Sequence, residues 1–305
     1  MPTQQEIRES VTKTIVETLE KGGLPPWRKP WRNDSNSGFP TNIVSGQKYR
    51  GINVLLLMAH SMAHGGCASK YYGTLRQWNK LGGRIKKRPD DVPPGRWGAT
   101  VVFWKQITKA EADEDGEEDQ KSYPLLRKYT VFCIDKVEGE HLDRFRVGYG
   151  EGEIQTGQIQ NYLDGKMAIV ATGADIRHGG NRAFYSPKED FIQLPHQSQM
   201  GLRDYYETAA HELIHWACAE QRIGFRGSYA MGELIAEIGS TFICSEWGIE
   251  PTEDLENHAA YLQSWLDAMK QDSRYIFQAA SIAAKAADFV LNFSRVPEPE
   301  LAFAE

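Results

Sequence analysis

Hydrophobic residues recur at helical spacing in several parts of this 305-residue chain. Residues 4–21 carry apolar side chains three or four positions apart, and two glycines follow. This periodicity predicts an amphipathic helix. The same pattern predicts further helices at about 154–165, 203–222, 230–247, 255–270 and 274–293.

Short apolar runs without helical spacing predict strands. A strand at 99–105 and a second one at 125–137 flank a polar insert, so we expect them to pair. Shorter strands are predicted at 169–171, 176–177, 183–185 and 190–195. Glycines at 148, 150 and 152 suggest a domain boundary near residue 150. The sequence therefore predicts an α+β fold in two domains, 1–150 and 151–305.

Charge is distributed unevenly along the chain. The net charge is −6. Residues 1–110 contain 18 basic and 7 acidic side chains, or +11, whereas 111–155 contain 6 and 13, or −7, and 156–305 contain 11 and 21, or −10. A basic segment joined to an acidic remainder favours a nucleic-acid-binding module fused to a domain of another kind.

Residues 110–120 form an acidic insert between the two predicted long strands. Seven of these residues are Asp or Glu. Such a segment is expected to be a disordered loop at the end of a hairpin, because it is almost purely acidic and has no large apolar residues to bury.

Aromatic and basic residues alternate in the first domain. Single-stranded nucleic acid binds to such mixtures, because rings stack on unpaired bases and cations follow the phosphates. The chain has no zinc-finger spacing and no clear helix-turn-helix, so we expect binding to single-stranded DNA without sequence preference. About half of the rings are expected to be core residues instead, including Trp104. The candidate DNA-binding residues are Trp27, Arg28, Trp31, Arg32, Tyr49, Arg50, Arg76, Trp78, Arg84, Lys86, Lys87 and Arg88.

His211-Glu212-Leu213-Ile214-His215 has the form H-E-x-x-H. On a helix, residues four apart lie on one face, so His211 and His215 can reach the same metal ion. Glu212 would stand beside the open coordination position, where it can act as a general base. The metal expected from this donor set is Zn²⁺, and another divalent transition metal such as Mn²⁺ is an alternative.

A third ligand is expected on the next predicted helix, where Glu233 and Glu237 share one face. A glutamate eighteen residues after the second histidine is similar to the gluzincin plan. In such families the first glutamate binds the metal and the second orients a histidine. That resemblance implies that Glu233 is the ligand and Glu237 its supporter, although the residues alone leave the two open. Tyr229 or Tyr185 could stabilise an oxyanion.

Cysteine usage and the chain termini bear on the compartment. Four widely spaced cysteines without a C-x-x-C pair argue against a disulfide framework. The N-terminus has no signal-peptide core, and no apolar run reaches membrane length. We expect a cytoplasmic protein that does not enter membranes.

Several motifs together resemble a known family. The segment 27–31, Tyr49-Arg50-Gly51-Ile52-Asn53, the 78–83 stretch and Val101-Val102-Phe103-Trp104 resemble the N-terminal domain of ArdC-type antirestriction proteins. That domain is also similar to part of conjugative plasmid primases. Residues 211–216 and 233–240 resemble the zincin-like domain that follows it in those proteins. The acidic insert is not associated with the family core.

The resemblance implies a protein of mobile elements that binds single-stranded DNA and protects incoming DNA from restriction during conjugation. It also implies a gluzincin-like metallopeptidase domain with a short mixed sheet and several helices, acting on an unidentified protein substrate. Two alternatives remain open. The metal site could be only structural, or the protein could be a DNA-binding regulator that cleaves a repressor.

Overall fold

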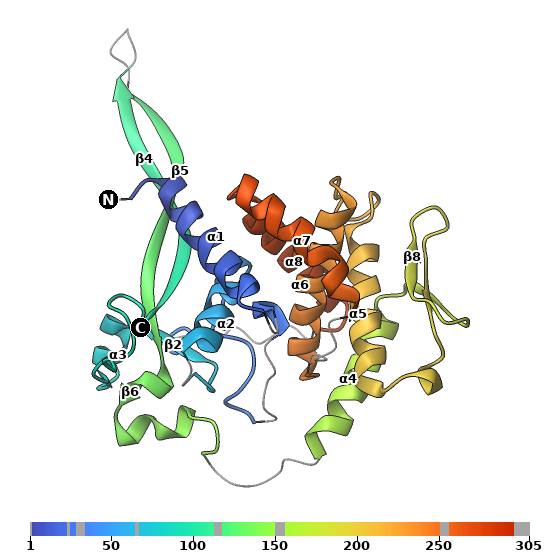
Figure 1. The fold of residues 1–305 in the computed structure, drawn as a ribbon, viewed down its shortest axis with the longest axis horizontal. Helices are drawn as coiled ribbons and strands as arrows, with labels where there is room; N and C mark the ends of the chain where they lie inside the picture. The colour runs from blue at the N-terminus through green and yellow to red at the C-terminus, as the bar shows by residue number, and fades with distance from the viewer. Residues whose placement is uncertain are drawn as a thin grey trace. The chain divides into compact units, whose positions relative to one another are not determined.

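The computed structural model describes residues 2–22, 25–28, 34–64, 67–112, 118–149, 156–250 and 256–295. Figure 1 shows the elements in chain order. They are α1 (Gln4–Glu20), η1 (Pro26–Arg28), β1 (Thr41–Asn42), α2 (Ile52–His64), β2 (Tyr71–Thr74), α3 (Leu75–Lys80), β3 (Arg84–Ile85), β4 (Ala99–Ala112), β5 (Glu118–Cys133), η2 (Ile134–Lys136), β6 (Val137–Glu138), η3 (Glu140–Phe145), α4 (Thr156–Ala171), β7 (Asp175–His178), β8 (Phe184–Ser186), β9 (Phe191–Leu194), η4 (Gln197–Gln199), α5 (Leu202–Cys218), α6 (Tyr229–Trp247), α7 (Glu256–Gln271) and α8 (Tyr275–Leu291).

The chain divides into two compact units. The first unit comprises Met1–Gly152 and Glu253–Ser281, and the second comprises Glu153–Thr252 and Ile282–Glu305. Helix α8 is therefore divided between them, whereas the sequence predicts that 151–305 is a single domain. The two-domain α+β class is confirmed, and the position of the domain boundary stays a prediction.

A four-stranded sheet in the order β1-β2-β5-β4 organises the first unit. Strands β4 and β5 pair antiparallel without a break from Ala99↔Val131 to Ala112↔Glu118, which makes a long hairpin (Figure 1). Strand β4 ends the strand order, and the Asn53 side chain bonds both backbone polar groups of Val102 there, at 2.7 and 2.8 Å. These bonds satisfy polar groups on β4 that a further strand would otherwise pair.

The core of the first unit lies between this sheet and helices α1, α2 and α7. A capping box at Thr3 begins α1, and the predicted apolar stripe of that helix is buried. The fully buried Trp27 packs edge-to-face on Trp265, with ring centroids 6.3 Å apart. Another fully buried indole, Trp78, donates a 2.9 Å hydrogen bond from Nε1 to the carbonyl of Phe132.

The second unit places two long helices beside a small mixed sheet in the order β7-β9-β8. Strand β7 is parallel to β9, whereas β8 is antiparallel to it and ends the strand order. Helices α5 and α6 approach closely at Gly239, where an added Cβ would lie 2.7 Å from Ile214 Cδ1. The glycine therefore determines how close the two helices come.

Most predicted elements are present, and three predictions are wrong. Residues 169–171 are the end of α4 rather than a strand, because a short apolar run also fits one side of a helix: Ala168 and Ile169 are buried and Val170 is exposed. Residues 134–136 form a 3-10 turn after β5. The predicted disordered loop at 110–120 is instead paired strand at 110–112 and 118–120. The hydrogen bonds of an antiparallel pair join backbone groups, so they can form between acidic residues as well. Residues 113–117 lie outside the described residues.

Two further observations bear on the sequence analysis. All four cysteines are free and buried. Within the described ranges, no helix is long and apolar enough to cross a membrane.

Candidate metal centre and candidate nucleic-acid surface

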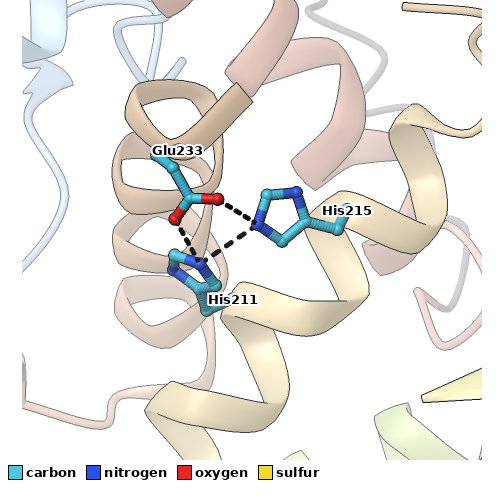
Figure 2. A group of neighbouring side chains, drawn as sticks. All are labelled: His211, His215 and Glu233. Carbon is cyan, nitrogen blue, oxygen red and sulfur yellow. Dashed lines mark hydrogen bonds and ion pairs between the residues drawn. The ribbon is translucent and has the colours of Figure 1, made fainter. Parts of the chain in front are cut away.

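Helix α5 carries the two histidines of the H-E-x-x-H motif. The helix forms because its apolar side, including Leu213 and Ile214, is fully buried in the second unit. That packing leaves His211 and His215 one turn apart, with their Nε2 atoms 3.2 Å from each other. The two imidazoles point to one position, as Figure 2 shows.

Glu233 completes a three-residue group from the neighbouring helix α6. Its carboxylate oxygens lie 3.6 Å from His211 Nε2 and 3.5 Å from His215 Nε2. Two donor atoms that each lie about 2.1 Å from a tetrahedral ion are about 3.4 Å apart. The observed separations of 3.2–3.6 Å match that value, so the three residues could hold a metal ion.

Glu237 lies behind the group, on the other side of the His211 ring. Its Oε1 atom is 3.4 Å from Nδ1 of His211, and its side chain is 6% exposed. The two glutamates thus contact different nitrogens of one imidazole. A carboxylate in the position of Glu237 fixes the tautomer and orientation of a histidine whose Nε2 faces a metal.

The electrostatics of the group favour a positive charge. Burial lowers the pKa of the His211 imidazole, but the hydrogen bonds that the imidazole donates to Glu233 and Glu237 outweigh burial and raise the pKa to about 10. Burial, together with the charge on His211, lowers the pKa of His215 to about 4. The carboxylates therefore stabilise one positive charge here.

Glu212 is buried, with 7% of its surface exposed. Burial raises the pKa of its carboxyl group, and the charge of His211 partly offsets that effect. The backbone N–H of Tyr185, on strand β8, donates a hydrogen bond to Glu212. A carboxylate with a raised pKa beside a metal site is suited to general-base chemistry.

The two candidate tyrosines differ in their surroundings. The Tyr185 hydroxyl donates to Asp190 Oδ1 at 2.8 Å and accepts from Gln221 Nε2 at 3.3 Å. The Tyr229 side chain is 72% exposed and makes a hydrogen bond to Glu233. Only Tyr229 therefore contacts a residue of the metal group directly.

An ion pair that the sequence analysis did not single out connects the small sheet to helix α5. Arg222 Nη2 bonds both carboxylate oxygens of Asp190 at 2.7 Å, and Arg222 Nη1 donates to the carbonyl of Trp216. Asp190 has a left-handed backbone, with φ 54°. No motif marks this pair, because its members are 32 residues apart.

The aromatic candidates for DNA binding are mostly core residues. Trp27 and Trp78 are fully buried and Tyr49 is 6% exposed, so in this conformation none of them offers a ring face to a base. Large rings near a sheet gain by packing in the core, which accounts for this burial. The role of these rings in DNA stacking stays a prediction, and their burial does not support it. Trp31 and Arg32 lie outside the described residues.

The cationic candidates are spread over the surface of the first unit, with one exception. Arg28 is 4% exposed and belongs to the core. Arg50, Arg76 and Lys87 are exposed. Arg84 forms an ion pair of 3.2 Å with Glu138, and Lys86 Nζ donates to the carbonyl of Asp135. Arg88 donates to the carbonyls of Pro89 and Val92.

Exposed aromatic side chains occur instead on the β4–β5 hairpin. Trp104, predicted to be a core residue, is 53% exposed, so that prediction is wrong. The cation of Arg8, on helix α1, lies 5.6 Å from the ring centroid and leaves about half of the residue exposed. Phe103, Tyr123 and Tyr129 are also exposed. Strand periodicity places Phe103 and Trp104 on opposite faces, but it does not indicate that both rings are exposed.

Comparison with protein-family models finds two matches, which follow each other along the chain. Residues 5–132 match the N-terminal domain of anti-restriction factor ArdC, and residues 165–282 match a zincin-like metallopeptidase domain. The second match contains His211, Glu212, His215, Glu233 and Glu237.

Related chains cover nearly the whole sequence. The uncharacterised protein y4eC of Sinorhizobium fredii is 34% identical over 94% of this chain and 92% of its own length. A DNA primase TraC of Escherichia coli is 33% identical over 97% of this chain, which spans only 20% of the primase.

Two solved structures of the antirestriction protein ArdC from plasmid R388 are similar to this fold. The metal-free structure has a TM-score of 0.72 and 37% identity, and covers 95% of this chain and 98% of that one. The Mn(II)-bound structure has a TM-score of 0.69 and 34% identity, and covers 96% and 99%. With both domains matched in order and the similarity extending over nearly both full lengths, the chain belongs to the ArdC antirestriction family.

Proposed function

We propose that this protein binds single-stranded DNA without sequence preference, carries a zinc-dependent peptidase site, and protects incoming DNA from restriction during conjugation. The separation of the donor atoms of His211, His215 and Glu233 is the observation that supports the peptidase site. The plasmid origin of the ArdC structures supports a role in conjugation.

In this proposal the five residues of the centre have three kinds of role: metal ligand, support of a ligand, and general base. His211, His215 and Glu233 hold the metal, and Glu237 orients His211 through Nδ1. A divalent metal at this position would polarise a peptide carbonyl and lower the pKa of a bound water. Glu212 takes a proton from the attacking water and passes it to the leaving amine. Zn²⁺ is the expected ion, with Mn²⁺ as the alternative.

The protein substrate would bind as an extended strand along β8. That strand ends the sheet order, and its residue Tyr185 contacts Glu212 through the backbone. An exposed strand edge holds a peptide through main-chain hydrogen bonds, which bring a carbonyl to a fixed position. Tyr229, beside Glu233, is the candidate for stabilising the oxyanion.

The decisive experiment compares the wild type with Glu212→Gln in conjugation into a restricting recipient. Loss of a general base lowers a rate by about 10²–10⁴-fold. We therefore expect protection to be lost while metal content, measured by mass spectrometry, and DNA affinity stay unchanged. Glu220→Gln is the matched control, because this exposed glutamate lies just after the end of α5.

Three results are informative. Loss of protection by Glu212→Gln alone supports proteolysis as the working activity. Full protection by that variant contradicts it and favours DNA coverage with a structural metal. If the wild type itself gives no protection, the antirestriction role is wrong for this protein.

A further inference from the structure

The β4–β5 hairpin carries a row of rings and cations on one face. Directly paired residues of an antiparallel ladder project to the same side. Phe103 pairs with Arg127, Ile107 with Tyr123, Lys105 with Leu125 and Val101 with Tyr129. We call Phe103, Lys105, Tyr123, Arg127 and Tyr129 the ring face.

The rings of this face are exposed although they are large. Phe103 is 47%, Tyr123 44% and Tyr129 42% exposed. The Phe103 and Tyr129 rings contact each other edge-to-face, with centroids 5.8 Å apart, and the buried Tyr49 lies 6.5 Å from Phe103. Tyr49 therefore supports Phe103, and Phe103 supports Tyr129, so these two exposed rings are held in place with part of their surface open.

The charge on this part of the hairpin is positive throughout. Residues 99–107 and 122–133 include Lys105, Arg127 and Lys128 and no Asp or Glu. Lys105 and Arg127 belong to the ring face itself. A polyanion is therefore attracted to the same side of the hairpin on which the rings are exposed.

We propose that the ring face is the surface of this protein that binds single-stranded DNA. The proposal rests on the proposed DNA-binding function and assigns it to Phe103, Tyr123 and Tyr129 with Lys105 and Arg127, rather than to the buried Trp27, Tyr49 and Trp78. From the Val101 pair to the Ile107 pair the face is about 20 Å long, enough for several nucleotides.

Single-stranded DNA fits this face better than a duplex does. Exposed rings gain by stacking only where bases are unpaired, and stacking accepts any base because every base has a flat face. The ring face has no row of Asn or Gln side chains for reading base edges. The expected binding is therefore independent of sequence and sensitive to salt.

The test measures binding of the full chain to a fluorescent oligothymidylate by anisotropy. Phe103→Leu and Tyr129→Leu keep an apolar side chain and remove the ring. The matched control is Trp104→Leu, because Trp104 is 53% exposed on the same hairpin and projects to the opposite face. Thermal unfolding of each variant reports on the fold.

We expect Phe103→Leu and Tyr129→Leu each to weaken binding about tenfold, within the roughly 5- to 150-fold range of base stacking, and Trp104→Leu to have little effect. The logarithm of the binding constant falls linearly with the logarithm of the salt concentration. Arg127→Gln should make that slope less steep by about 0.7, and the neighbouring Lys128→Gln should leave it unchanged.

The outcomes separate this inference from the proposed function. If the wild type binds the oligonucleotide and Trp104→Leu weakens binding as much as Phe103→Leu, the ring face is not the binding surface. If well-folded ring variants bind like the wild type, the inference is also overturned and a protein partner becomes the occupant to consider. If the wild type binds no single-stranded DNA, the proposed DNA-binding function fails as well.

Discussion

The candidate metal centre in the second unit and the ring face in the first unit differ in how deeply their side chains are buried. At the metal centre, the side chains of His211, Glu233 and Glu237 are 20%, 12% and 6% exposed, on two helices that touch at Gly239. On the ring face, the rings are 42–47% exposed on a long two-stranded ribbon. A metal needs donor atoms placed within a few tenths of an ångström, whereas stacking accepts many base positions, and the two kinds of support match these demands.

The largest expected effect concerns the two glutamates of α6. Glu233→Gln removes a carboxylate that faces both Nε2 atoms, and we expect Zn²⁺ affinity to fall by more than about 100-fold. Glu237→Gln leaves the donor group intact but weakens the support of His211, and we expect a loss of about 10- to 100-fold. Competition with a chromophoric chelator measures both values.

Single-stranded DNA affinity is the control for both variants. We expect it to stay unchanged, because these residues belong to the second unit and the ring face to the first. A larger loss of Zn²⁺ affinity in Glu237→Gln than in Glu233→Gln would exchange the roles of the two glutamates.

A smaller effect is expected from the Asp190–Arg222 pair. The Arg222 side chain is 12% exposed and makes two hydrogen bonds of 2.7 Å to Asp190, which is 44% exposed. After allowance for that exposure, we expect Arg222→Gln to lower the free energy of unfolding by about 1 kcal/mol in urea denaturation. Arg84→Gln in the first unit is the control, because both members of the Arg84–Glu138 pair are exposed, and we expect less than about 0.5 kcal/mol.

The pH dependence of the Asp190 pair has a defined sign. The hydrogen bonds from Arg222 hold the pKa of Asp190 below its usual value of 3.8. The pair therefore stabilises the fold above pH 3.8 and loses this contribution as the pH falls through the lowered pKa. The difference in the free energy of unfolding between the wild type and Arg222→Gln should become smaller in that acidic range. A difference that stays constant there would show that the ion pair is not its source.

The proximity of His211 and His215 follows directly from the sequence because helix geometry is local. A spacing of four residues brings His211 and His215 together on any helix, and Glu233 and Glu237 follow the same rule. What the spacing leaves open is which glutamate faces which nitrogen of His211. That depends on how closely α5 and α6 pack at Gly239, and so on tertiary contacts that the periodicity does not contain.

The exposure of the aromatic residues is harder to predict, because the residue type does not determine whether a ring is buried. Trp27 is in the core, where it meets Trp265 from 238 positions later, whereas Trp104 meets the Arg8 cation of α1 and stays 53% exposed. Both rings stand beside basic residues in the sequence. Strand alternation predicts which residues share a face of the hairpin. It does not predict how far the pairing continues into the acidic insert.

The smallest expected effect comes from the acidic residues of that insert. The seven acidic residues lie in the sequence between the positively charged segments 99–107 and 122–133, so their charge opposes DNA phosphates approaching the ring face. We expect replacement of all seven by Asn and Gln to strengthen oligothymidylate binding about two- to threefold at 50 mM salt. At 1 M salt, where the screening length is only about 3 Å, the difference should disappear. Equal binding of the two proteins at low salt would mean that the DNA lies too far from the insert for its charge to act, and would favour a binding surface away from the hairpin. The residues concerned are Glu111, Asp113, Glu114, Asp115, Glu117, Glu118 and Asp119.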